Sequence, residues 1–315
     1  MTDFALLFPG QGSQSVGMLA GLAEKHQQVR QTFEQAGEIL GTDLWQLVRE
    51  GPEAELNRTE LTQPAVLAGA VAVWRVWQAL DGPTPSRLAG HSLGEYSALV
   101  VAGALDFETA VALVAERGRQ MQAAVPEGVG AMAAILGLED EVVAAICREV
   151  AEDQVVGPAN YNSPGQIVIA GHGAAVERAL HKCSEAGARR AVKLPVSVPS
   201  HSPLMKPAAE AMREILADTE MGRPAVPVVH NCDVAQHDDA DAIREALVRQ
   251  LTHPVRWTET VRAIGEAGIM DFAECGPGRV LCGLGRRIER QARWVGLENP
   301  DSLEETIANF KESQQ

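Results

Sequence analysis

The segment Gly90-His91-Ser92-Leu93-Gly94-Glu95-Tyr96 does more than any other to decide the fold of this chain. It contains the pattern Gly-x-Ser-x-Gly, follows a short, largely apolar stretch at 87–89, and precedes a helix-like run at 95–101. A strand, a tight turn and a helix in that order form a nucleophile elbow, which projects a serine hydroxyl from the end of a sheet. Only glycines fit so close to the strained turn. The segment therefore predicts an α/β fold with a reactive serine at Ser92.

The same segment indicates how Ser92 would react. The backbone N–H of Leu93 lies at the start of the following helix, where negative charge is stabilised. A serine beside such a donor is typical of acyl transfer through an acyl-serine ester. The alternative is a Gly-Ser-Gly turn without chemistry, because so short a pattern also occurs by chance.

The composition describes a globular chain of 315 residues and excludes several classes of partner. The formal net charge is −15, so a phosphate backbone would be repelled and nucleic acid is not expected as a partner. Every apolar run is broken before about 18 residues, and the acidic start is unlike a signal peptide, so no membrane span is expected. Five cysteines without metal-ligand spacing indicate reduced thiols, a cytoplasmic location and no metal site.

Short apolar runs alternate with helical patterns along most of the chain, which predicts a largely parallel sheet covered on both faces. The expected strands are 4–8, 87–89, 226–230, 270–274 and 294–297, and the expected helices are 19–40, 64–80, 95–101, 107–124, 205–216, 240–251, 257–267 and 280–290. The C-terminus is expected to be a polar tail. This core resembles the α/β-hydrolase class.

The pattern changes between residues 127 and 198. Strands are expected at 131–136, 155–156, 166–170 and 191–196, with helices at 140–149 and 174–186. The order β-α-β-β-α-β is the ferredoxin-like arrangement. We therefore predict a ferredoxin-like subdomain at 127–198, inserted into an α/β core formed by 1–126 and 199–315, with the active site in the cleft between them.

A serine nucleophile needs a base, and His201 is the best candidate. It lies in a proline-bracketed loop at 197–203, where the chain returns from the subdomain to the core. An ordinary loop histidine is the alternative, with His230 and His253 as other candidate bases. A hydrolase triad would also need a carboxylate. No acid stands out, so a Ser-His dyad oriented by a neutral carbonyl is expected.

Arg117 lies in a helical pattern together with Met121, one turn further on the same face. An arginine can bind a carboxylate through two parallel hydrogen bonds, which a lysine cannot do. If Arg117 faces the site, the substrate carries an acid. The alternative is a surface arginine paired with Glu116 or another neighbour.

Several motifs together carry a family resemblance. In chain order they are Phe8-Pro9-Gly10-Gln11-Gly12-Ser13-Gln14, Gly90-His91-Ser92-Leu93-Gly94-Glu95-Tyr96, Arg117-Gly118-Arg119, Asn162-Ser163-Pro164-Gly165-Gln166 with Ala170-Gly171, Ser200-His201-Ser202-Pro203-Leu204-Met205, and Gly276-Pro277-Gly278. From about residue 3 to residue 298, the chain resembles the malonyl-CoA:acyl carrier protein transacylases of type II fatty acid synthesis.

The resemblance implies a mechanism and a set of roles. Ser92 would take the malonyl group from malonyl-CoA, with His201 as base, and pass it to the phosphopantetheine thiol of acyl carrier protein. The oxyanion would lie between the backbone N–H groups of Gln11 and Leu93. Arg117 would bind the malonyl carboxylate, with Met121 beside it. The backbone carbonyl of Gln250 would orient the histidine, and no cofactor would be needed.

An acidic carrier protein would need a basic patch on this acidic chain. The candidate docking residues are Arg189, Arg190, Lys193, Lys206, Arg286 and Arg287. The alternative for each is a solvated surface cation. Two other functions remain open from the sequence: a serine hydrolase, such as a thioesterase or carboxylesterase, and a carrier-protein-binding scaffold without activity.

Overall fold

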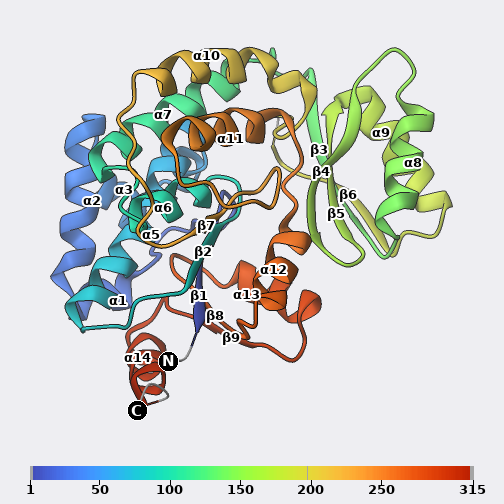
Figure 1. Ribbon diagram of the computed structural model, residues 1–315. Coiled ribbons are helices and arrows are strands. Elements are labelled where there is room, and N and C mark those ends of the chain that lie inside the picture. Colours follow the sequence, from blue (N-terminus) through green and yellow to red (C-terminus); the bar gives the residue numbers. More distant parts are fainter. Residues whose placement is uncertain (1–2, 197, 313–315) are drawn as a thin grey trace.

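A five-stranded sheet forms the centre of the larger part of the protein (Figure 1). The computed structural model describes residues 3–196 and 198–312. The strand order is β7-β2-β1-β8-β9, and every pairing is parallel. The strands are β1 (Phe4–Phe8), β2 (Arg87–Gly90), β7 (Val228–Val229), β8 (Asp271–Glu274) and β9 (Arg293–Gly296). This confirms the predicted α/β class with a parallel sheet.

The central strand β1 is apolar throughout because both of its faces are covered. Phe4, Leu6 and Phe8 belong to one hydrophobic cluster, whereas Ala5 and Leu7 belong to another. This alternation follows from the two-residue period of a strand. The sheet therefore separates two cores.

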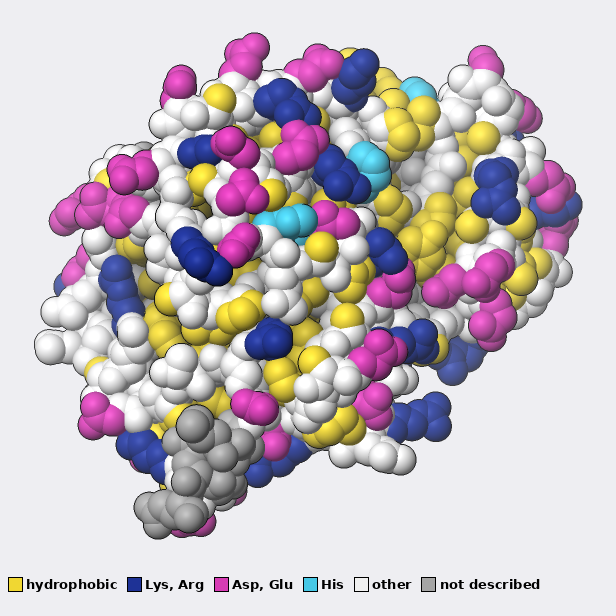
Figure 2. Space-filling view, in the orientation of Figure 1, with side chains coloured by type: hydrophobic (Ala, Val, Ile, Leu, Met, Phe, Trp, Pro, Cys, Tyr) yellow, Lys and Arg dark blue, Asp and Glu magenta, His cyan; other side chains and the backbone are white. Residues whose placement is uncertain are grey.

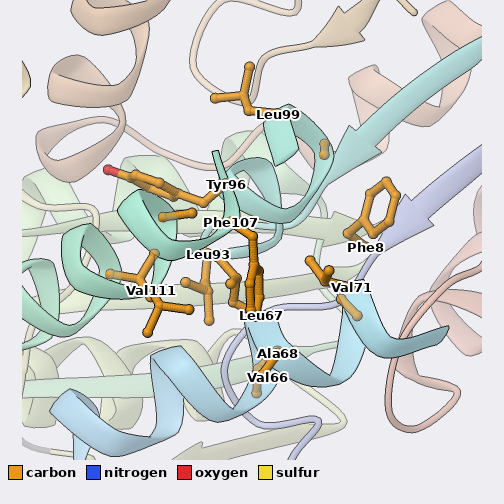
Figure 3. Close-up of a cluster of buried hydrophobic side chains, with 14 of the residues drawn as sticks. Phe8, Val66, Leu67, Ala68, Val71, Leu93, Tyr96, Leu99, Phe107 and Val111 are labelled. Carbon is orange, nitrogen blue, oxygen red and sulfur yellow. The ribbon is translucent and has the colours of Figure 1, made fainter. Parts of the chain in front are cut away.

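Helices cover both faces of this sheet. In chain order they are α1 (Ala20–Lys25), α2 (Gln27–Leu40), α3 (Leu44–Glu50), α4 (Glu53–Leu56), α5 (Thr59–Ala79), α6 (Gly94–Val101), α7 (Phe107–Ala123), α10 (Lys206–Ala217), α11 (Ala240–Thr252), α12 (Trp257–Glu266), α13 (Val280–Ile288) and α14 (Pro300–Glu312). In the larger core, Leu67 and Val71 of α5 gather with Phe8, Leu93 and Phe107, as Figure 3 shows. Trp257 of α12 and Leu281 of α13 pack in the smaller core.

A second, four-stranded sheet lies beside the first, at the right of Figure 1. Its elements are β3 (Gly130–Leu136), α8 (Asp140–Val150), β4 (Val156–Ser163), β5 (Gln166–His172), α9 (Gly173–Glu185) and β6 (Arg190–Lys193). The strand order is β4-β5-β3-β6, and all pairings are antiparallel. The element order β-α-β-β-α-β is the predicted one. Backbone hydrogen bonds between Tyr161 and Val255, and between Val255 and Ala159, join this unit to the larger one.

Two helix predictions were wrong in their bounds. The expected helix at 19–40 is two helices, because His26 has an extended backbone (φ −132°, ψ 107°) between α1 and α2. Pro64 was expected at the start of a helix, but it lies inside α5, which begins at Thr59. Thr59, Thr62 and Gln63 are buried, so packing against the core extends this helix beyond the proline.

The C-terminus is not a polar tail but the helix α14, and helices α3 and α4 were also not predicted. Leu303, Ile307 and Phe310 form the buried face of α14, at the spacing of one helix side. Phe310 packs on Phe4 of β1 with a ring-centroid distance of 4.4 Å.

Within residues 3–196 and 198–312, no helix combines the length and the apolar composition needed to cross a bilayer. The predicted domain limits include residues 1–2, 197 and 313–315, which lie outside the described residues.

Candidate active site

The elbow around Ser92 has the strained geometry that its glycines predict. β2 ends at Gly90, α6 begins at Gly94, and Ser92 between them has a φ of +52°. A Cβ atom on Gly90 would lie 1.9 Å from the backbone carbon of Gly94, and one on Gly94 would lie 2.1 Å from the carbonyl oxygen of Phe8. No other residue fits at either position, because backbone atoms cannot move aside.

His201 lies within hydrogen-bond distance of Ser92, as a base partner must. The Ser92 Oγ lies 2.7 Å from His201 Nε2, and His201 Nδ1 lies 2.7 Å from the backbone oxygen of Gln250. Because a carbonyl only accepts, His201 Nδ1 donates to it and Nε2 is left free to accept the serine proton. Burial, and then the positive charge of Arg117, lowers the pKa of His201 to about 3. The histidine is therefore neutral at physiological pH.

Arg117 of α7 faces the site and is 1% exposed. Its Nη1 donates to Gln63 Oε1 at 2.8 Å, and its Nη2 donates to Gln250 Oε1 at 2.9 Å and to Ser92 Oγ at 3.4 Å. The alternative pairing with Glu116 is wrong, since that carboxylate accepts from Arg119 instead. Among the described residues, no carboxylate lies within 4.0 Å of the Arg117 guanidinium. The guanidinium therefore has no direct ionic partner among the described residues.

A cavity of about 760 Å³ opens over these residues. Met121 of α7 lines it on the side of the larger unit, and Met132, Asn160 and Val168 line it from the second sheet. The remaining wall includes the loop after β6 and the loop after β1. The cavity therefore lies between the larger unit and the second sheet.

Gln11 and Leu93 both line this cavity. Within the described residues, no hydrogen bond occupies the backbone N–H of either one. Leu93 precedes α6, so its N–H belongs to the free N-terminal end of a helix. Two unused donors beside a nucleophile are what an oxyanion site needs.

The other candidate bases do not reach Ser92. His230 is fully buried and shares a 2.7 Å hydrogen bond with Glu95, through Nδ1. The exposed His253 bonds to the backbone oxygen of Arg249, at 2.9 Å. Both are held by groups outside the Ser92–His201 pair.

Sequence reasoning missed five polar side chains that hold the site. Asn231 accepts from the Ser92 N–H and donates to the Gly90 carbonyl, both at 2.6 Å. Gln63 and Glu95 are fully buried. His91 Nε2 lies 2.8 Å from Asn162 Oδ1 of β4, which ties the elbow to the second sheet. Glu95, His91 and Asn162 all lie in the quoted motifs, and that was the available signal.

The six docking candidates are all exposed and none lines the cavity. Lys193 pairs with Glu177 at 2.8 Å and Lys206 with Glu210 at 3.7 Å. Arg286 donates to a backbone oxygen and Arg287 to Gln166. The remaining two candidates, Arg189 and Arg190, lie at the start of β6.

An elbow serine, a histidine base and a cleft between two units define an acyl-transferring enzyme. The chain belongs to the acyl transferase family, since the model of the acyl transferase domain matches residues 5–302. A malonyl CoA-acyl carrier protein transacylase from Escherichia coli (strain K12) is 55% identical over 303 residues, which are 96% of this chain and 98% of that protein. The protein of the same name from Bacillus subtilis (strain 168) is 44% identical over 99% of this chain and 98% of that protein.

Two solved structures are similar over almost the whole chain. The malonyl CoA-acyl carrier protein transacylase from Coxiella burnetii has a TM-score of 0.96 and 51% identity, covering 98% of this chain and 97% of that one. A malonyl-transacylase in complex with a type II PKS acyl-carrier protein has a TM-score of 0.97 and 56% identity, and the match covers 98% of this chain and 100% of that one. The resemblance seen in the sequence is thereby confirmed.

Proposed function

We propose that this protein transfers a malonyl group from malonyl-CoA to the phosphopantetheine thiol of acyl carrier protein through a malonyl-Ser92 ester. The choice of substrate rests on one observation, the buried Arg117. Its Nη2 lies 3.4 Å from Ser92 Oγ, and no carboxylate of the described residues pairs with it. An anion attached close to the reacting carbonyl would complete this site. The names of the similar proteins support the same substrate and the same acceptor.

In the first half-reaction, the proton of Ser92 Oγ moves to His201 Nε2 while the oxygen attacks the thioester carbonyl. The N–H groups of Gln11 and Leu93 stabilise the oxyanion, each typically worth about 3 to 4 kcal/mol in the transition state. The C–S bond then breaks, and His201 returns the proton to the departing sulfur of CoA. Arg117 binds the malonyl carboxylate throughout.

In the second half-reaction, the carrier-protein thiol gives its proton to His201 and attacks the ester carbonyl. The C–O bond breaks, and the proton returns from His201 to Ser92 Oγ. His201 is oriented by the Gln250 carbonyl rather than by a carboxylate. A neutral orienting group stabilises the imidazolium less, so activation of water is weaker than in a hydrolase triad. This favours transfer over hydrolysis.

Intact-mass spectrometry tests the proposal. Mixing with malonyl-CoA should add one malonyl group to the protein and none to Ser92→Ala. An adduct that persists in Ser92→Ala would reject the intermediate. Continuous release of CoA without acyl carrier protein would instead indicate a hydrolase, and no adduct on the unaltered protein would indicate a scaffold.

The proposal extends to the architecture and the location. We propose that residues 127–198 are a ferredoxin-like subdomain inserted into a core, 1–126 and 199–315, that resembles the α/β-hydrolase class. The antiparallel order β4-β5-β3-β6, with α8 and α9 packed together on one side, supports the first part. A cytoplasmic location is part of the same proposal, supported by five unpaired cysteines. Limited proteolysis at the 126/127 and 198/199 limits would test the subdomain.

A further inference from the structure

A fully buried carboxylate lies directly behind the elbow, in a position that the mechanism above does not use. Glu95 is the second residue of α6, is 0% exposed, and does not line the cavity. Its Oε1 lies 2.7 Å from His230 Nδ1, and its Oε2 accepts from the backbone N–H of Asn231 and from Gln250 Nε2, both at 2.9 Å. A buried charge is retained at a cost, so its three contacts call for an explanation.

Two of the residues that contact Glu95, Asn231 and Gln250, also form hydrogen bonds with the reacting residues. Asn231 holds the backbone N–H of Ser92. Gln250 holds Ser92, Arg117 and His201 together: its Nε2 donates to the Ser92 carbonyl at 3.0 Å, its Oε1 accepts from Arg117 Nη2, and its backbone oxygen accepts from His201 Nδ1. One carboxylate therefore anchors the groups that position all three.

The same carboxylate acts on the charge of the site. Burial lowers the pKa of Arg117, and the negative charge of Glu95 is among the groups that oppose this effect. The two charges are connected by the side chain of Gln250, which accepts from Arg117 and donates to Glu95. Glu95 is thus a buried acid separated from the Arg117 guanidinium by a single side chain, that of Gln250.

We propose that Glu95 is a positioning residue that also acts as the resting counter-charge of Arg117, and so limits how strongly the empty site attracts the substrate carboxylate. This inference rests on the proposed function. It assigns to Glu95 two separable effects: geometry, transmitted through hydrogen bonds to Ser92 and Gln250, and charge, transmitted to Arg117.

Other charged groups face Glu95 from the segment after β7 and from α11. Burial alone would lower the pKa of His230, but the charge of Glu95 and its hydrogen bond more than offset this, and the pKa of His230 is raised. Beyond it lie His237, with a ring-centroid distance of 5.0 Å from His230, and Asp233, which pairs with His237 at 3.0 Å and with Arg249 at 3.6 Å. When His230 is protonated, it takes up part of the Glu95 charge.

The variant Glu95→Gln separates charge from geometry. Its amide oxygen can replace Oε2 and accept from Asn231 and Gln250. Its NH2 group can replace Oε1 and donate to His230 Nδ1, if the imidazole carries its proton on Nε2. All three hydrogen bonds then persist without the negative charge. Glu95→Ala, by contrast, removes the hydrogen bonds as well.

The charge is measured by binding, in a Ser92→Ala background that cannot react. Calorimetry gives the dissociation constants of malonyl-CoA and acetyl-CoA, and their ratio isolates the effect of the carboxylate. We expect Glu95→Gln to increase the preference for malonyl-CoA roughly tenfold, because the guanidinium loses its resting counter-charge. His230→Gln should decrease the preference at pH 6, because Glu95 then keeps its full charge, and this decrease should vanish as the pH rises through the raised pKa of His230.

The geometry is measured by acylation with Ser92 present. Glu95→Ala should slow malonyl loading about a hundredfold, the effect of a small misplacement of reacting groups, while Glu95→Gln should keep most of the rate. The matched control is Glu274→Gln. That carboxylate is also buried, but it accepts from the backbone N–H groups of Leu281 and Cys282 at the start of α13. The Glu274→Gln variant should be less stable than the unaltered protein but should keep the same preference for malonyl-CoA over acetyl-CoA.

An unchanged preference in both Glu95→Gln and His230→Gln would overturn the inference. If only His230→Gln folds, an unchanged preference at pH 6 overturns it equally. Normal loading in Glu95→Ala would reject the positioning effect. If the Ser92→Ala protein itself binds malonyl-CoA no better than acetyl-CoA, it is the proposed function that fails, which separates the two failures.

Discussion

At the residue scale, Arg117 is a buried charge with no carboxylate of the described residues within 4.0 Å, and in the proposed reaction the substrate carboxylate is its direct partner. An acetyl group would leave the guanidinium without a direct ionic partner, at a cost of roughly 3 to 5 kcal/mol. That corresponds to a discrimination of several hundredfold or more, at about 1.4 kcal/mol per factor of ten. Arg117→Ala should therefore lose malonyl loading and relatively gain acetyl loading. The measurement is the ratio of the two loading rates.

Arg117→Lys serves as the comparison for this prediction. A lysine keeps the charge but cannot bond at once to Gln63, Gln250 and a carboxylate in one plane. It should not restore the malonyl preference. A ratio that stays unchanged in Arg117→Ala would contradict the role of Arg117.

The second prediction at this scale concerns the pH dependence set by His201. The base works only when neutral, and its pKa is lowered to about 3, first by burial and then by Arg117. The kcat/KM for malonyl loading should therefore stay level as the pH falls from 8 to about 5, well below the ordinary histidine value of about 6.5. Loss of activity should appear only as the pH approaches the lowered pKa.

In Arg117→Ala, the loss of activity at acid pH should begin at a higher pH, because one of the causes of the lowered pKa of His201 is removed. Residual acetyl loading gives the profile in that variant. If kcat/KM of the unaltered protein already fell near pH 6.5, His201 would not be held neutral in the free enzyme.

At the scale of elements, the segment that follows β7 clamps the turn between β2 and α6. Asn231 provides both bonds of this clamp. Asn231→Ala would leave a buried N–H and a buried carbonyl without partners, which costs about 1 to 3 kcal/mol for each group. We expect a loss of about 2 to 4 kcal/mol in the free energy of unfolding, measured in urea, and slower malonyl loading.

Asn299→Ala is the control for the clamp. Its Oδ1 accepts from the backbone N–H of Ser302, at the start of α14 and far along the chain from the elbow. It should lower the stability without slowing the loading. Equal slowing in both variants would mean that the loading rate only reports the stability of the fold.

The elbow could be predicted because its sequence signal is local: Gly90, Ser92 and Gly94 lie within five residues, although the backbone that excludes a side chain at Gly94 is that of Phe8 in β1. The alternation of strands and helices along the chain, including the elements of the second sheet, followed from hydrophobic patterns that are also local, whereas the order of strands within the sheets was not predicted. The orientation of Arg117 was left open, because a helical pattern does not say which partner covers its face. Asn231 and Glu95 were missed because their contacts join residues more than 130 positions apart. Such contacts leave no periodic trace in a single sequence.

The limits of helices failed where tertiary packing overrides local signals. Pro64 and the polar composition of 300–312 both indicate that no helix continues there. Each is outweighed by a buried face, which the residues of α5 and α14 supply only once the sheet exists.

At the scale of the whole molecule, the charge of −15 bears on the proposed acidic partner. On the face shown in Figure 2, Asp and Glu side chains are spread over the surface with Lys and Arg between them. Arg286 and Arg287 are exposed in the last turn of α13. Reversing both charges should slow transfer to acyl carrier protein roughly tenfold at low salt and leave malonyl loading nearly unchanged.

The matched control reverses Lys25 and Arg30, which lie on α1 and α2. This control changes the net charge by the same amount as the reversal at Arg286 and Arg287, but the rate of transfer to acyl carrier protein should stay the same. The effect at α13 should shrink as salt rises, since exposed charges are screened beyond about 8 Å at physiological ionic strength. Equal losses in both half-reactions would reject α13 as the docking site.

The central position of β1 has a consequence for how the protein is made. This strand is synthesised long before one of its neighbours, β8 at Asp271–Glu274, and before Phe310, which packs on the ring of Phe4. Until those residues are synthesised, one edge of a fully apolar strand has no partner, and such edges template aggregation. The larger unit therefore closes only after β8 has been synthesised, whereas the second sheet, whose strands all lie within 130–193, can form earlier.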